Sequence, residues 1–194
     1  MAGVTAPTVR LLVLGMVHTR AGRDGMHGYA IHKELMSWRV DTWTAVKPPS
    51  IYHAVKQLTR EGLLRAAEPA HSPRGPSRVS YAITEAGVDE FHRLLRSALV
   101  SPDIEELGAG IAFMRCLPRS TVADLLRSQL QTTRDIGEQL QDMKSLWPEP
   151  GEPPHAAHLL DLWRGSFAAH AIWTAAMVDR IAAGEFDFAD DADR

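Results

Sequence analysis

Apolar residues recur at steps of three and four along most of this chain, the spacing that places side chains on one face of an α-helix. Residues 8–17 depart from that pattern because nearly all of them are apolar, which predicts a first helix buried on all sides. Residues 27–36 carry Ala30, Ile31 and Leu35 at helical steps and predict a short amphipathic second helix. Residues 39–47 show no clear period, so we expect a connector there.

The third predicted helix begins at Pro48 and Pro49, because proline is tolerated in the first helical turn, where its missing N–H would have no partner. Ile51, Val55 and Leu58 then follow at four- and three-residue steps, which predicts one buried face. The outward face carries Ser50, His53, Lys56, Gln57 and Arg60. These donors and cations suit the phosphates and base edges of a DNA major groove, so the segment predicts a recognition helix.

The helical period ends at Gly62, and two strand-length runs follow at residues 63–68 and 78–83, separated by a segment rich in turn-forming residues. We expect them to form a β-hairpin with a basic tip. Thr84 is placed to cap a further helix that begins at Glu85. The order helix, helix, helix, strand, strand, helix is that of a winged helix-turn-helix, so the sequence predicts a DNA-binding regulator.

The remaining sequence predicts helices only, over residues 104–116, 118–146 and 155–184, with a proline-rich break at 147–154. Two long helices joined by such a turn should pack antiparallel. The last helix is apolar around most of its circumference, and little chain is left to cover it. We therefore expect a second copy of the chain to cover it, giving a homodimer with a dyad axis.

Three regions result from this pattern. We expect a winged helix-turn-helix DNA-binding domain over residues 1–100, a helical dimerisation and effector domain over residues 101–185, and a disordered acidic tail over residues 186–194. The predicted fold class is mainly α with a small β-hairpin, in which the N-terminal winged module is followed by an antiparallel helical domain.

Charge separates along the same boundary. The 194-residue chain has a net charge of −3, yet residues 1–100 carry 13 Lys and Arg against 8 Asp and Glu, giving +5, and residues 101–194 carry 8 against 16, giving −8. A basic module joined to an acidic one is expected where only one of them contacts phosphate. The alternative for this charge pattern is chance segregation of surface charge. The alternative for the function is a winged helix that serves as a protein-interaction module and does not bind DNA.

Other chemistry receives little support from the sequence. Cys116 is the only cysteine, so it is either an oxidant sensor or an inert core thiol. His155 and His158 lie one helical turn apart, but two ligands do not close a metal site, so we expect neither metal nor cofactor. No phosphate loop or nucleophile motif favours an enzyme. Without a signal-peptide pattern or a run that spans a bilayer, we expect a cytoplasmic protein with no membrane partner.

Four ordered motifs carry a family resemblance: Leu14-Gly15; His27-Gly28-Tyr29-Ala30-Ile31; Ser50-Ile51-Tyr52-His53-Ala54-Val55 with Leu58 and Glu61-Gly62-Leu63; and Tyr81-Ala82-Ile83-Thr84-Glu85-Ala86-Gly87. Over residues 8–95 they resemble the PadR family of bacterial transcriptional regulators, and the helical remainder resembles its longer-tailed subfamily with a C-terminal dimerisation domain. The resemblance implies a dimeric repressor that binds a palindromic operator and releases it when a small molecule binds. The chain departs from the family pattern at Pro49 and His53, where Gly and Pro are usual.

The resemblance also assigns candidate DNA contacts: Tyr29, Ser50, Tyr52 and Lys56 on helices, and Arg74 and Arg78 in the wing. Tyr52 could instead pack its ring under the wing, and Lys56 and Arg74 could be ordinary solvated charges. The outward face of the third helix adds candidates for base readout, namely Ser50, His53 and Gln57.

Aromatic residues gather in the last predicted helix and the break before it: Trp147, Trp163, Phe167 and Trp173. They could line a pocket for an aromatic or cationic effector through stacking and cation–π contacts. The alternative is that the same rings pack at a dimer interface.

Overall fold

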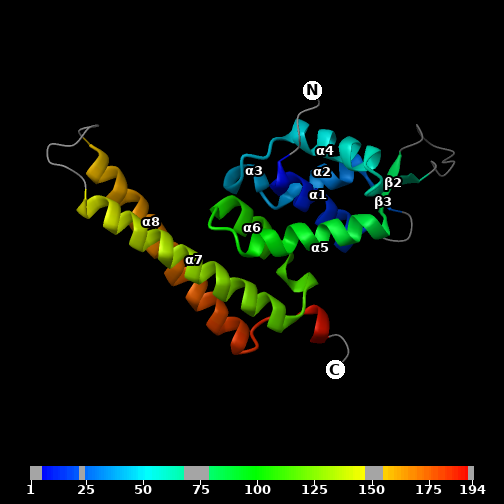
Figure 1. Ribbon diagram of the computed structural model, residues 1–194. Coiled ribbons are helices and arrows are strands. Elements are labelled where there is room, and N and C mark those ends of the chain that lie inside the picture. The colour runs from blue at the N-terminus through cyan, green and yellow to red at the C-terminus, as the bar shows by residue number, and fades with distance from the viewer. Residues whose placement is uncertain (1–5, 22–24, 68–78, 147–154, 192–194) are drawn as a thin grey trace. The chain divides into compact units, whose positions relative to one another are not determined.

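The computed structural model describes residues 6–21, 25–67, 79–146 and 155–191, which form two compact units (Figure 1). The first unit contains the chain up to residue 98 together with residues 103–113, and the second contains residues 99–102 and the chain from residue 114. This division differs from the predicted boundary at residue 100, because the helix after that boundary belongs to the first unit. Among the described residues, no helix is long and apolar enough to cross a membrane.

The first unit is built from helices and a small antiparallel sheet. In chain order its elements are α1 (Pro7–Arg20), β1 (Met26–His27), α2 (Gly28–Ser37), α3 (Val40–Trp43), α4 (Pro48–Arg60), β2 (Leu64–Ala67), β3 (Ser80–Ile83), α5 (Glu85–Leu99) and α6 (Ile104–Phe113). The strand order is β1-β3-β2, with Met26 opposite Tyr81 and Leu64 opposite Ile83. The predicted hairpin is confirmed as β2 and β3. The prediction missed β1 and the α3 turn, which are too short to show a period.

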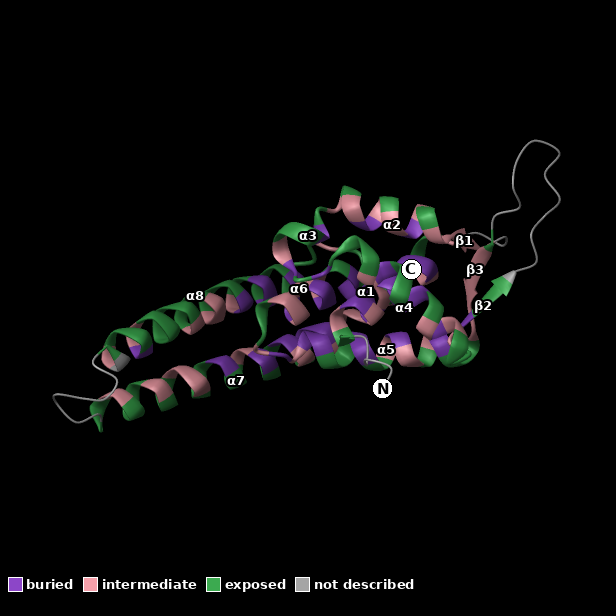
Figure 2. Cartoon of the chain, turned by 90° about the horizontal axis from the view of Figure 1, so that it is seen from above, coloured by how far each residue is buried: buried purple, intermediate pink, exposed green. Residues whose placement is uncertain are grey.

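Helix α1 forms the centre of the first unit, as its apolar sequence predicted. Leu12, Val13 and Leu14 have no exposed surface, and Figure 2 shows buried positions gathered around α1. Gly15 lies under the ring of Phe113, where a β-carbon would come within 2.6 Å of the ring atoms. Phe113 also contacts the rings of Trp38 and Phe91. These contacts explain why α6 is part of the first unit and not of the helical domain.

Thr84 caps α5, as predicted, and ties it to the end of α4. Its Oγ1 accepts a hydrogen bond from the Gly87 N–H at 3.0 Å and donates to the Gly62 carbonyl at 2.8 Å. Gly87 is needed here because a β-carbon at that position would collide with the carbonyl oxygen of Leu63. The wing strand therefore starts in direct contact with the first turn of α5.

The second unit is an antiparallel helical hairpin. It contains the short 3₁₀ turn η1 (Met114–Cys116), helices α7 (Arg119–Ser145) and α8 (Ala156–Ala182), and the 3₁₀ turn η2 (Ala189–Asp191). At one end Arg119 donates to the Ile181 carbonyl at 3.0 Å, and at the other Lys144 Nζ donates to both oxygens of Asp161, at 2.7 and 2.6 Å. The predicted long antiparallel helices are thus confirmed, whereas the predicted helix over residues 104–116 ends at Phe113 and continues as η1.

A polar layer crosses the interior of this hairpin. The fully buried Gln129 donates from Nε2 to Thr133 Oγ1 at 2.8 Å, and the same atom lies 3.1 Å from His170 Nε2 on α8. Burial lowers the pKa of His170, because the charged imidazolium is less well solvated there. The layer fixes how α7 and α8 face each other, since a shift along the helices would leave these groups without partners.

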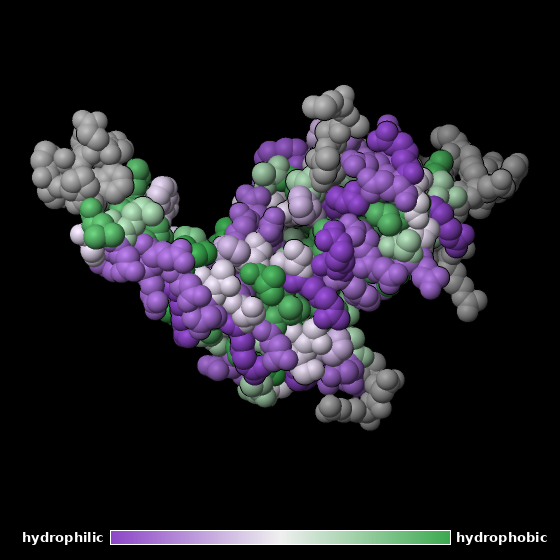
Figure 3. All heavy atoms as spheres, in the orientation of Figure 1, coloured by the Kyte–Doolittle hydropathy of each residue, from purple (hydrophilic) through white to green (hydrophobic). Residues whose placement is uncertain are grey.

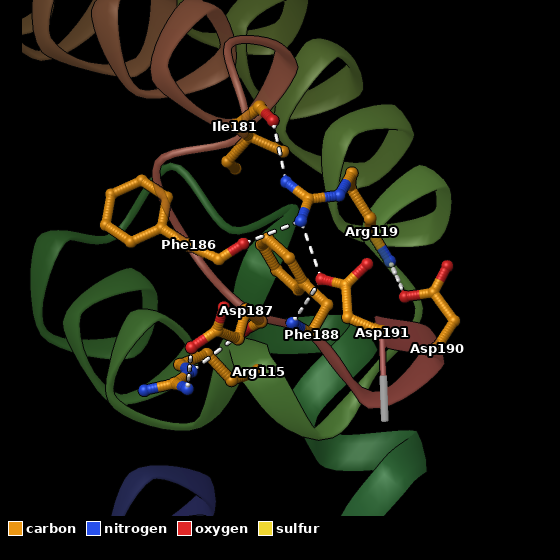
Figure 4. Close-up of polar contacts among 8 residues, drawn as sticks. All are labelled: Arg115, Arg119, Ile181, Phe186, Asp187, Phe188, Asp190 and Asp191. Carbon is orange, nitrogen blue, oxygen red and sulfur yellow. Dashed lines mark hydrogen bonds and ion pairs between the residues drawn. The ribbon is translucent and has the colours of Figure 1, made fainter. Parts of the chain in front are cut away.

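The predicted disorder of the acidic tail is wrong for residues 186–191, which fold back onto the start of α7 (Figure 4). Asp191 forms an ion pair with Arg119 at 2.6 Å, and Phe188 is buried with only 4% of its surface exposed. Asp190 accepts a hydrogen bond from the Arg119 N–H at 3.0 Å. Because α7 starts after Pro118 without a side-chain cap, the tail supplies the missing acceptor. Residues 192–194 lie outside the described residues.

Candidate nucleic-acid interface

The start of α4 is held by a reciprocal pair of hydrogen bonds. Ser50 Oγ accepts from the Lys47 N–H at 3.2 Å and donates to the Lys47 carbonyl at 2.7 Å. Pro48 and Pro49 occupy the first two helical positions, where no N–H is required. The hydroxyl proton of Ser50, which the sequence offered for base readout, is therefore already committed to the helix start.

The end of α4 turns sharply into the wing. Gly62 adopts φ +74, a left-handed conformation that glycine adopts without strain. The Gly62 N–H donates to Thr59 and the Leu63 N–H donates to Leu58, the pair of bonds that closes a Schellman motif. The position of β2 relative to α4 is thus fixed by backbone bonds.

Helix α4 has two distinct faces. Ile51, Ala54, Val55 and Leu58 are buried, with at most 3% exposure. The opposite face presents His53, Lys56 and Arg60 as exposed side chains, and Gln57 is half-buried. Gln57 Nε2 donates to Glu61 Oε1 at 2.8 Å, and Glu61 in turn pairs with Arg10 at 2.7 Å. The outward face that the spacing predicted is present, with Gln57 partly engaged by its neighbour.

Two candidate tyrosines lie beside this face. Tyr29, at the start of α2, is 62% exposed, and Tyr52 on α4 is 39% exposed. The Tyr52 ring stacks on His32 of α2, with centroids 5.5 Å apart and an interplanar angle of 27°. Tyr29 also contacts His32, at 6.4 Å. Sequence reasoning did not single out His32, because a ring contact between two helices leaves no spacing signal.

Only part of the wing belongs to the described residues. Arg74 and Arg78 lie in residues 68–78, outside the described residues, so their predicted DNA contacts stay predictions. Arg65 on β2, opposite Ala82 of β3, is exposed and was not among the predicted residues.

The other candidates from the sequence are dispersed. Cys116 is half-buried, and burial raises the pKa of its thiol, which disfavours the reactive thiolate. His155 and His158 stack at 6.3 Å, and the described residues contain no cluster of three or more side chains suited to a metal.

The predicted effector residues do not share one pocket within the chain. Phe167 lines an open groove of about 350 Å³ between α7 and α8, bordered by Arg134 and Arg164. Trp163 and Trp173 are not among the residues that line it; they are exposed on α8, by 50% and 44%. Trp147 lies outside the described residues.

Helix α2, helix α4 and the strands β2 and β3 make a winged helix-turn-helix, a class of module that presents one helix to the major groove of DNA. Residues 17–93 match the family model described as "Transcriptional regulator PadR-like family". Over these residues the chain is similar to the PadR-like family of transcriptional regulators, the family that its four motifs resemble. A comparison with curated proteins finds no match.

Several solved structures are similar to this chain. PadR of Bacillus subtilis in complex with operator DNA is 20% identical, with a TM-score of 0.40 and coverage of 89% of this chain and 98% of that one. The same protein in complex with p-coumaric acid is 22% identical, with a TM-score of 0.39 and coverage of 93% and 99%. The smu.1604c protein of Streptococcus mutans is 17% identical, with a TM-score of 0.40 and coverage of 88% and 98%.

Proposed function

We propose that this chain is a homodimeric PadR-like repressor that binds a palindromic operator through α4 and the wing, and that a small aromatic or cationic effector releases it. In a dyad dimer of this class, the two recognition helices enter successive major grooves roughly 34–36 Å apart. The proposal rests above all on the two faces of α4, because one face is fully buried while the other presents donors and cations.

The exposed face of α4 has the chemistry of a DNA contact. His53, Lys56 and Arg60 can donate to phosphate oxygens or to base edges, and none carries a negative charge. The tyrosine hydroxyls of Tyr29 and Tyr52 can donate to phosphates at the same surface. The buried face ties these side chains to the core of the first unit, so they are presented on a rigid element.

The exposed face of α8 supports a second copy as the partner of the second unit. Its exposed apolar side chains are Leu159, Leu162, Trp163, Ile172 and Trp173, with 44% to 72% of their surface accessible in the single chain. In Figure 3 hydrophobic atoms gather at the end of the α7–α8 pair, where Met143 and Leu146 are also exposed. A closed, self-complementary dimer covers such a face on both copies at once.

The effector part of the proposal rests on the same helix. Trp163 and Trp173 could stack on an aromatic or cationic compound once a second copy encloses them. Titration of tryptophan fluorescence with phenolic and cationic compounds tests this point, and a flat signal across the panel would remove the effector from the proposal.

Fluorescence anisotropy with a labelled duplex tests DNA binding. The duplex is recovered by selection from random-sequence DNA, and it is titrated at several salt concentrations with unlabelled competitor present. Saturable binding that resists competitor supports the proposal. If selection recovers no duplex, or if binding is absent even at low salt, the result contradicts the proposal and favours the alternative, a winged-helix protein-interaction module without DNA binding.

A further inference from the structure

All three tyrosines of this chain gather at the junction of α2 and α4. Tyr29 and Tyr52 contact His32, and a β-carbon placed on Gly28 would lie 3.9 Å from the Tyr52 ring and 3.7 Å from the Tyr81 ring. His32 contacts both of the tyrosines proposed to contact DNA. Nothing in the described structure shows a hydrogen bond that holds its ring.

The environment of His32 is unusual for a histidine. Both ring nitrogens are shielded from solvent, and neither has a hydrogen-bond partner among the described residues. Burying polar atoms without partners costs free energy, so the position is not explained by the nitrogens. The flat ring of His32 explains the position better, since its centroid distances to the Tyr52 and Tyr29 rings fall in the range typical of aromatic pairs.

We infer that His32 is a positioning residue for DNA binding, because its ring joins α2 to α4 and fixes the orientation in which Tyr52 and Tyr29 meet the duplex. The inference rests on the proposed function, in which these tyrosines contact DNA. A side chain that is ordered before binding loses less conformational freedom on binding. Tyr52 is 39% exposed, and the stack on His32 is a contact that limits the rotation of its ring.

Substitutions at His32 test the inference in the full-length protein. Because residues in contact are typically coupled, His32→Ala should weaken binding of the selected duplex about fivefold. His32→Phe keeps a flat ring and removes both unpartnered nitrogens, so it should restore the wild-type affinity. In a Tyr52→Ala background, His32→Ala should have little further effect. His92→Ala is the control, because His92 is a half-buried histidine of the same unit whose ring contacts are to His18 and Phe91.

A second readout needs no DNA. Protein labelled with 3-fluorotyrosine should give three ¹⁹F resonances, which Tyr→Phe variants assign. In the free protein, His32→Ala should move the Tyr52 resonance, His32→Phe should move it less, and His92→Ala should leave it unchanged.

The outcomes separate this inference from the proposed function. If the wild-type protein binds but His32→Ala behaves like His92→Ala, the inference is wrong and the proposed function stands. It is also wrong if His32→Phe fails to restore affinity, or if His32→Ala costs as much in the Tyr52→Ala background as in the wild type. A wild-type protein that retains no duplex refutes both.

Discussion

The two units of this chain differ most in what their outer helical faces expose. In the first unit, the middle of α1 from Leu11 to Val17 is buried, and α4 exposes polar and cationic side chains such as Lys56. In the second unit, α8 exposes large apolar side chains, with Ile172 72% accessible. The apolar face of α4 is buried within the first unit, whereas α8 leaves several large apolar side chains exposed.

This contrast indicates two kinds of partner. A surface of donors and cations keeps its hydration in the free chain and exchanges it for phosphate contacts. An apolar surface gains free energy only when another apolar surface covers it. The negative charge of residues 101–194 disfavours DNA as the partner of α8, so a second copy fits that surface better.

The largest effect is expected from Phe188, which tests whether the tail belongs to the core of the second unit. Phe188→Ala removes a ring that is 96% buried and that lies 4.9 Å under the Arg119 guanidinium. We expect a loss of about 3 kcal/mol in the unfolding free energy, because large core side chains cost about that much when truncated. Hydrogen exchange should show the loss in α7 and α8. Phe186→Ala, at a half-buried ring, is the control, and equal small effects from both variants would mean that the tail is not part of the core.

Ile172 tests whether α8 meets a second copy. Ile172→Glu places a charge on the exposed face without touching the chain's own core. Burial of one such side chain contributes about 1.5–3 kcal/mol, so we expect dimerisation to weaken at least about tenfold. Sedimentation equilibrium measures the change. Ser128→Glu adds the same charge on an exposed position of α7 and should have little effect. A wild-type monomer, or a dimer unaffected by Ile172→Glu, would contradict the claim that a second copy covers the apolar face of α8.

The dependence of the unfolding free energy on acidic pH tests an ion-pair network found in the first unit. Arg93 beside Glu90, together with Arg10, holds the pKa of Glu90 below its ordinary value. The ionised Glu90 therefore stabilises the fold fully above its pKa in the unfolded chain, about 4.3. This contribution is lost as the pH falls through the lower pKa that Glu90 has in the folded chain.

Glu90→Gln should flatten this acid dependence by under about 1 kcal/mol, since exposed and half-exposed pairs contribute little. Urea unfolding at a series of pH values measures it. Glu185→Gln breaks an exposed pair with Arg180 in the second unit and serves as the control. The same loss of unfolding free energy at acidic pH in wild type and Glu90→Gln would show that the network does not contribute to stability.

Much of the fold could be predicted because each long helix carries its own period. The bounds of α4, α7 and α8 agree with the spacing of their apolar residues to within a few positions. The short β1 and α3 were missed because they show no period, whereas the misses at the tail and at α6 depend on contacts between distant parts of the chain. The tail is held by Arg119, which lies 72 positions before Asp191, and α6 is placed by Phe113 under Gly15.

In the candidate site, too, some features could be predicted from the sequence and others could not. The outward face of α4 follows from spacing alone, so His53, Lys56 and Arg60 were found from the sequence. The commitment of Ser50 to the helix start and the stack of His32 on Tyr52 depend on three-dimensional contacts that no spacing reveals.

The salt dependence of DNA binding by Lys56→Ala tests the central claim most directly. Lys56 is exposed on α4, and each phosphate contact contributes about one unit to the slope of log affinity against log salt concentration. We predict a slope shallower by about one unit than in the wild type. Arg127→Ala removes the same formal charge from α7, where it pairs with Asp124, and should leave the slope unchanged. Equal slopes for Lys56→Ala and wild type would contradict the placement of α4 on the phosphate backbone.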